Sequence, residues 1–167
     1  MTETASSSPD ESAQRFRILI AYDGSPDARR AIAHAARLFP GHHALVLTAW
    51  VAFPDASPSL TLAPGGVVMA AASALSDVQQ ERAEETAAEG MRLATDAGLS
   101  AEALVMRSRE SDWEAIVRGA EERDASVVVI GSRGRSAIAA AVLGSVSTGV
   151  VHHSRRPVLV VPRPEEA

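Results

Sequence analysis

The sequence predicts an α/β domain with a doubly wound, mostly parallel five-stranded sheet and helices on both faces, a Rossmann-like fold. Five short apolar runs rich in β-branched residues alternate with helical segments along the chain. This alternation is typical of parallel strands joined by helical crossovers. The chain has 167 residues, 46% of them hydrophobic, which suits one domain with a sizeable core.

The first strand and helix follow a polar N-terminal segment. Residues 1–15 lack apolar periodicity and are expected to form a disordered tail, so the domain is expected to span residues 16–163. An apolar run over 16–22 predicts a buried strand. Ser25 is a candidate helix cap, Pro26 suits the first helical position, and Asp27 complements the helix dipole. The helix is expected to end near residue 39, before Pro40 and Gly41.

The remaining elements continue the alternation. Strands are expected over 44–51, 101–106, 126–130 and 157–161, and helices over 68–97, 112–122 and 144–154. The alternating 101–106 strand is placed nearer an edge, and the fully apolar 126–130 strand is placed centrally. Residues 53–66, rich in Pro, Ser and Gly, are expected to form a long loop, a kind that is usually functional or mobile. Trp113 is expected to pack its helix against the sheet. The inward side of the long helix is expected to carry Leu75, Val78, Arg82, Thr86, Met91 and Ala94.

Absent residue types exclude several kinds of site. The chain has no cysteine, which excludes disulfides and thiolate metal sites, and no lysine, which excludes a Walker A site and a Schiff base. A net charge of −5 argues against a general nucleic-acid binder. No apolar run is long enough to span a membrane, and the N-terminus lacks a signal-peptide core. The sequence therefore predicts a cytoplasmic protein with no nucleic-acid or membrane partner.

Two strand ends carry the residues suited to ligand chemistry. Asp23 follows the first strand, and Gly131 and Gly134 follow the fourth. Ligands of open parallel sheets bind beyond such carboxyl ends. Gly144 and Ser145 then open a helix, whose N–H groups and dipole favour an anion. The sequence therefore predicts a phosphate site between these segments.

The spacing of Gly131, two residues, Gly134, nine residues, Gly144 and Ser145 resembles the ATP-binding pattern of the universal stress protein family. The likeness extends over residues 17–163. The resemblance implies that the ligand is ATP and that the strand ends and the glycine loop together form its site. In that family the residue matching Asp23 approaches the ribose and phosphates, in some members through a divalent metal, here Mg²⁺ or Mn²⁺. The implied site residues are Ala21, Asp23, Trp50, Ile130, Gly131, Arg133, Gly134, Gly144, Ser145, Val146 and Ser147.

Several of these residues have a purely structural alternative. Asp23 could cap the turn that follows it, the glycines could serve ordinary turns, and the Ser147 hydroxyl could bond back to its own helix. Trp50 could stack on adenine or crowd it. Arg135, at the edge of the glycine loop, is expected to be mainly solvated.

The resemblance implies a regulatory or stress-response protein that acts by binding ATP. The alternatives are a slow ATPase or nucleotidyl-transferring enzyme on the same fold, and a dimeric interaction module that binds no nucleotide. A homodimer is expected through the apolar strand at 157–162, which family members pair across a two-fold axis. An unpaired apolar edge would otherwise favour aggregation.

Overall fold

The computed structural model describes residues 16–52, 67–134 and 143–163. The expected tail at 1–15, the loop at 53–66 and Arg135 lie outside the described residues. For the start of the long helix, at 67–73, the backbone alone is described.

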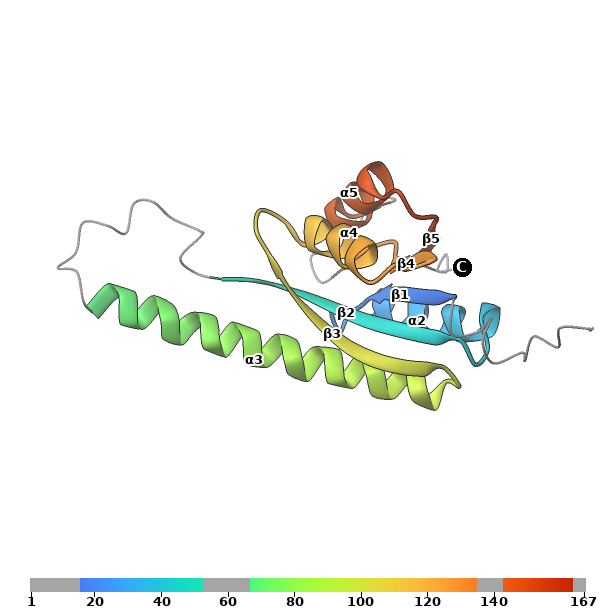
Figure 1. Cartoon of the computed structure of the whole chain (residues 1–167), viewed down its shortest axis with the longest axis horizontal. Coiled ribbons are helices and arrows are strands. Elements are labelled where there is room, and N and C mark those ends of the chain that lie inside the picture. Colours follow the sequence, from blue (N-terminus) through green and yellow to red (C-terminus); the bar gives the residue numbers. More distant parts are fainter. Residues whose placement is uncertain (1–15, 53–66, 135–142, 164–167) are drawn as a thin grey trace, which may run out of the picture.

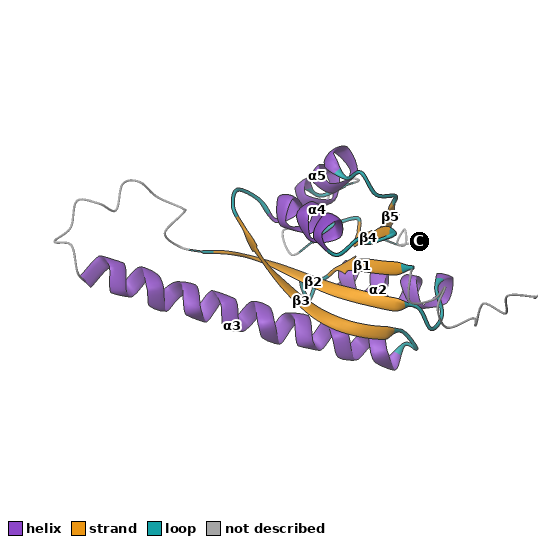
Figure 2. Cartoon of the chain, viewed as in Figure 1, coloured by secondary structure: helices purple, strands orange, loops and turns teal. Residues whose placement is uncertain are grey.

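Five strands and four helices alternate in the described parts of the chain, as the sequence predicts (Figure 2). All strand pairings are parallel, and the strand order is β3-β2-β1-β4-β5. The doubly wound fold class is therefore confirmed, with β3 at an edge and the fully buried β4 inside the sheet. In chain order the elements are β1 (Arg17–Ala21), α2 (Pro26–Leu38), β2 (His43–Val51), α3 (Val67–Asp96), β3 (Ser100–Ser108), α4 (Asp112–Glu122), β4 (Val127–Gly131), α5 (Ser145–His153) and β5 (Val158–Val161).

The strand order reverses between β1 and β4. From β1 the chain continues outward to β2 and β3, and it then returns to place β4 on the other side of β1. The two strands pair through Ile18 with Val127 and Ile20 with Val129. At such a reversal the loops beyond the carboxyl ends diverge and leave a crevice for ligands. The fold thus opens a crevice between the loops that follow β1 and β4.

Helices cover the two faces of the sheet in pairs (Figure 1). Ile18 and Ile20 of β1 belong to one apolar cluster, which includes residues of α2 and α3. Leu19, between them, belongs to a second cluster, which includes residues of α4. Successive side chains of a strand point to opposite faces, so one buried strand supplies both cores.

The paired strands β2 and β3 are longer than their neighbours β1 and β4. β2 and β3 stay paired from His43 opposite Ser100 to Val51 opposite Ser108. The pairing of β1 with β2 ends at Ala21 opposite Leu47. The last four residues of β2, and the residues of β3 beside them, therefore project beyond the centre of the sheet as an overhang.

The buried face of α3 includes Ala94, as expected, but otherwise differs from the expectation. Leu75 and Val78 are 45% and 44% exposed, and Arg82 is exposed. Small residues approach the sheet instead. A Cβ at Gly90 would lie 2.6 Å from the Tyr22 ring and 2.7 Å from Val46, so the helix axis comes close because side chains are small there. The buried stripe consists of Ala83, Ala87, Gly90 and Ala94.

Trp113 packs against the apolar cluster of the sheet, as expected, and also makes a contact that was not expected. Its ring stacks on that of His153, with 4.2 Å between centroids, and a Cβ at Gly149 would overlap the indole. It borders the second apolar cluster, but its ring contacts α5. Trp113 therefore joins α4 to α5 rather than holding α4 on the sheet alone.

Candidate functional site

A cavity of about 540 Å³ opens at the carboxyl ends of β1, β2 and β4. Its volume lies within the range of about 300–1,000 Å³ of small-molecule sites. The structure brings together every site residue that the resemblance implies. These are Ala21, Asp23, Trp50, Ile130, Gly131, Arg133, Gly134, Gly144, Ser145, Val146 and Ser147.

The first turn of α5 borders this cavity with backbone donors that have no acceptor within the helix. Gly144 is the N-cap residue, its backbone is extended, and it has no side chain to cap the helix. The first turn holds no acidic residue. The Gly144 N–H donates to the Ser132 carbonyl at 2.8 Å, whereas the Ser145 and Val146 N–H groups precede the first intrahelical bond, made by Thr148. An anion in the cavity could accept from both.

The three glycines of the motif have different roles in the fold. A Cβ at Gly131 would lie 2.8–2.9 Å from Asp27, including its backbone, and one at Gly134 would lie 2.8 Å from Asp23 Oδ2. A Cβ at Gly144 would meet its nearest neighbours at 3.6 Å, an ordinary contact distance. Packing against backbone therefore accounts for Gly131. At Gly134 the close atom is the end of a side chain that can move, and at Gly144 packing does not account for the glycine.

Asp23 connects the two loops of the crevice. Its Oδ1 accepts a hydrogen bond of 3.0 Å from the Ser25 N–H, so the structural alternative, a turn cap, is present. Its Oδ2 faces Gly134. One carboxylate therefore fixes the turn after β1 and borders the glycine loop after β4. Within residues 16–52, 67–134 and 143–163, no three His, Asp or Glu side chains cluster as a metal site would require.

The Ser147 hydroxyl has partners inside the protein. It is 2% exposed and lies 2.9 Å from the carbonyl oxygens of both Ser132 and Gly144, to which it can donate. The bond to Gly144 is the back-bonding that the structural alternative predicts. Its role as a ligand remains a prediction, and the described contacts make it a brace between α5 and the loop after β4.

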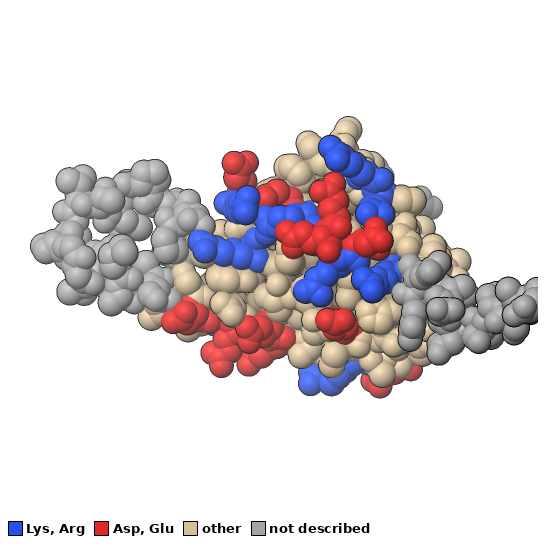
Figure 3. All heavy atoms as spheres, in the orientation of Figure 1, with Lys and Arg blue, Asp and Glu red and all other residues tan. Residues whose placement is uncertain are grey.

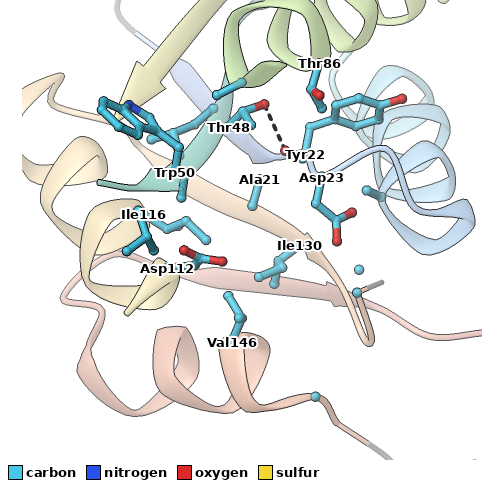
Figure 4. A pocket seen from close by; sticks show the side chains of 18 of the residues that line it. Ala21, Tyr22, Asp23, Thr48, Trp50, Thr86, Asp112, Ile116, Ile130 and Val146 are labelled. Carbon is cyan, nitrogen blue, oxygen red and sulfur yellow. Dashed lines mark hydrogen bonds between the residues drawn. The ribbon is translucent and has the colours of Figure 1, made fainter. Parts of the chain in front are cut away.

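The other end of the cavity is apolar with a polar rim (Figure 4). Ala21, Ile130 and Val146 line its middle. Thr48 is buried and donates to the Tyr22 carbonyl at 2.9 Å, which ties the overhang of β2 to β1. Trp50 lies half-buried on that overhang. Its part in base stacking remains a prediction.

Sequence reasoning missed a group of lining residues from α3 and α4. Asp112 and Ile116 are four residues apart, so they share one face of α4. The Ser108 hydroxyl, fully buried, donates to Asp112 Oδ1 at 2.9 Å. A helix start directly after a strand end was the available signal, because such positions border the crevice of this fold. The missed residues include Gln79, Arg82, Ala83, Thr86, Asp112 and Ile116.

A buried carboxylate supports the floor of the crevice. Asp27 is 1% exposed and forms ion pairs with Arg30 and, at 3.3 Å, with Arg163. Ser132 donates to its other oxygen at 3.4 Å. A buried charge requires such compensation. Asp27 thus joins the start of α2 to the loop after β4 and to the chain after β5.

Charge on the visible surface is mixed rather than basic. Figure 3 shows acidic and basic side chains side by side on one face. Ion pairs of the described residues include Arg118 with Glu114 at 2.9 Å and Arg123 with Glu102 at 3.9 Å. No helix in the described part of the chain is long and apolar enough to cross a membrane.

Comparisons with known proteins agree on one family. The model of the universal stress protein family matches residues 15–162. A universal stress protein of Thermus aquaticus is 37% identical over 149 residues, which cover 86% of this chain and 96% of the relative. One of Mycolicibacterium smegmatis is 28% identical over 94% of this chain, and the chain spans about half of that relative's length, 51%.

Solved structures share the fold. The structure of the hypothetical protein MJ0577 is similar with a TM-score of 0.73 and 22% identity, covering 92% of this chain and 99% of that one. The universal stress protein of Archaeoglobus fulgidus in complex with dAMP has a TM-score of 0.60 and 25% identity, covering 87% and 96%.

Proposed function

Because this chain belongs to the universal stress protein family, we propose that it binds ATP in the cavity between the loops after β1 and β4. It acts in a stress response through this binding rather than through fast catalysis, in the cytoplasm, as the sequence predicts. The proposal is consistent with the dAMP complex of the similar protein from Archaeoglobus fulgidus.

One observation carries the proposal: the uncapped start of α5 opens on the cavity. The N–H groups of Ser145 and Val146 lack intrahelical acceptors, and the helix dipole makes this end electropositive. Phosphate oxygens satisfy such donors without a lysine, which this chain lacks. Arg133, half-buried on the cavity wall, supplies a further cation for the phosphate chain.

A divalent cation fits this site only together with the nucleotide. Asp23 offers one carboxylate at the phosphate end. Mg²⁺ is commonly held by one or two carboxylates, waters and substrate phosphates. We therefore assign Asp23 as the protein ligand of Mg²⁺ or Mn²⁺, with the other ligands from phosphate and water. Bound there, the ion would neutralise phosphate charge.

The same proposal includes a homodimer through residues 157–162. β5 is an edge strand, and Val158, Leu159 and Val160 are half-buried. A second copy would cover this apolar edge. Light scattering across a concentration series should give twice the chain mass of 17.5 kDa. A monomer mass at tens of micromolar would contradict the dimer without affecting the nucleotide site.

Calorimetric titration with ATP and Mg²⁺ tests the nucleotide site, using wild type and Gly144→Val. A Cβ at position 144 meets nothing closer than 3.6 Å, so the variant should fold, while its side chain obstructs the donors of α5. Losing charge-assisted bonds of about 1.5–3 kcal/mol each should weaken binding by about a hundredfold or more.

Thr148→Val, one turn further along α5, is the matched control and should bind as wild type. Circular dichroism checks folding. Absence of heat with wild type at millimolar ATP would contradict ATP binding and favour the interaction module. Steady release of phosphate during the titration would favour the ATPase alternative.

A further inference from the structure

Asp112 places a second carboxylate in the cavity, away from Asp23. It lines the cavity at the start of α4. Figure 4 shows its carboxylate beside Ile116, with Ile130 and Val146 between it and the glycine loop. The described part of the chain gives Asp112 no cationic partner, and its one hydrogen bond comes from Ser108.

The charge of Asp112 decides which part of a nucleotide lies beside it. Phosphates next to this carboxylate would be repelled, and the donors suited to them lie at α5 instead. A nucleotide with its phosphates at α5 would therefore extend its ribose and base past Ile130 toward Asp112 and the overhang of β2. A carboxylate accepts hydrogen bonds only, so the group that meets it is an N–H or O–H donor.

The Ser108 hydroxyl orients the carboxylate of Asp112. It bonds to Oδ1 at 2.9 Å, and Ser108 is fully buried, so this oxygen is held in place. The Oδ2 atom is left wholly to the ligand. Of the donors of ATP, the ribose hydroxyls lie near the phosphates, whereas the 6-amino group of adenine lies at the far end of the base. The 6-amino group is therefore the donor that suits a carboxylate placed away from the phosphate end.

We propose that Asp112, oriented by Ser108, accepts a hydrogen bond from the 6-amino group of adenine and so selects adenine nucleotides. This inference rests on the proposed binding of nucleotide in the same cavity. Asp112 is thereby a specificity residue of the base end, distinct from Asp23 at the phosphate end.

Wild type provides the first test, with ATP, ITP and GTP titrated in parallel. In ITP an oxygen atom replaces the 6-amino group. This oxygen accepts hydrogen bonds, as the carboxylate does, so the two atoms would repel each other. ATP should therefore bind about tenfold or more tightly than ITP, and more tightly than GTP. Equal affinity for ATP and ITP, or tighter binding of GTP, overturns the role of Asp112 while the proposed function stands. Binding of none of the three overturns both.

Asp112→Asn provides the second test. The amide oxygen still accepts from Ser108, and the amide nitrogen turns a donor toward the base, where it suits the oxygen of ITP. The ratio of ITP to ATP dissociation constants should fall to within about threefold of unity. Glu121→Gln removes one exposed charge from the same helix and should leave the ratio as in wild type. A wild-type ratio in Asp112→Asn overturns the proposal.

Discussion

The starts of α2 and α5 lie on either side of the same crevice, yet their donors are used in opposite ways. In α2 the Ser25 hydroxyl accepts from the Ala28 N–H at 3.2 Å, and Asp27 adds a buried negative charge in the first turn. In α5 the cap is a glycine, with no side-chain bond and no acidic residue in the first turn. The start of α2 is capped by a side chain of the protein, whereas the start of α5 is where the proposed function places a ligand.

This difference separates stability from binding. The α2 start is tied to distant parts of the fold, because Asp27 also pairs with Arg163. The α5 start has a backbone that any residue can adopt, and space for a Cβ. Changes at α2 are therefore expected to lower stability, and changes at α5 are expected to lower affinity.

The largest effect is expected from Gly144→Asp, which gives α5 a cap like that of α2. The carboxylate would accept from the first-turn N–H groups and repel phosphate. ATP affinity should fall more than about a hundredfold. The free energy of unfolding should rise by about 0.5 kcal/mol through the helix dipole. Titration and thermal unfolding measure the two changes, and undiminished affinity would place the phosphates elsewhere.

Asp23→Asn should have the next largest effect. The amide keeps an acceptor for the Ser25 N–H, so the turn after β1 should persist. Because the negative charge at position 23 is lost, ATP without metal should be repelled less. ATP with Mg²⁺ should lose the one protein ligand of the metal. The gain in affinity on adding Mg²⁺ should shrink about tenfold, about 1.4 kcal/mol. Asp96→Asn, exposed at the far end of α3, should keep the wild-type gain.

Ser25→Ala should lower the free energy of unfolding and leave ATP affinity nearly unchanged. The change removes the side-chain cap of α2 but keeps the Ser25 backbone N–H, which donates to Asp23. Loss of such a cap costs about 1 kcal/mol, which lowers Tm by about 2–4 °C for a chain of this size. ATP affinity should change by less than about threefold, which corresponds to less than about 1 kcal/mol of binding free energy. A larger fall would show that the two helix starts are not independent.

The smallest effect concerns the residue before the turn into α2. Burial raises the pKa of Tyr22 above its usual value of 10.0, aided by its hydrogen bond to Glu89 and by the Glu89 charge, and opposed by Arg29. The folded state then holds the phenol proton more tightly than the unfolded state. The contribution to stability is full below pH 10 and is lost as pH rises through the folded-state pKa.

Alkaline unfolding experiments can isolate this group. The chain has one tyrosine, no lysine and no cysteine, and arginine stays charged, so no other side chain titrates between about pH 10 and 12. Stability should decline above pH 10 by at most about 1.4 kcal/mol per pH unit, and Tyr22→Phe should abolish the decline. A tyrosinate absorbance titration midpoint at or below 10 in folded protein would refute the shift.

Apolar periodicity sufficed to predict the alternation of strands and helices, and strand ends located the crevice. Apolar periodicity misplaced part of the inward side of α3. Ala83 and Gly90 pack against the sheet because they are small, whereas Leu75 and Val78 are exposed. Hydrophobicity alone does not report such close approach.

The candidate site was predictable where its residues follow a strand or open a helix in a known spacing. The start of a helix marked Asp112 as a position near the crevice, but no motif indicated its bond to Ser108, four residues earlier in the chain. Asp27 and its partner Arg163 are 136 positions apart in the chain. Their contact is set by tertiary structure rather than by local sequence.

The overhang of β2 and β3 affects where the sheet opens locally. Trp50 and the residue beside it on β3, Arg107, lie past the end of β1, and Thr48 is the described tie between this segment and β1. Strand ends with few neighbours open locally at a lower free energy than the centre of a sheet. Amide hydrogens at Ala49–Val51 should therefore exchange well before those at Ile18–Ile20. A base seated against this segment would slow that exchange and make the overhang a reporter of occupancy.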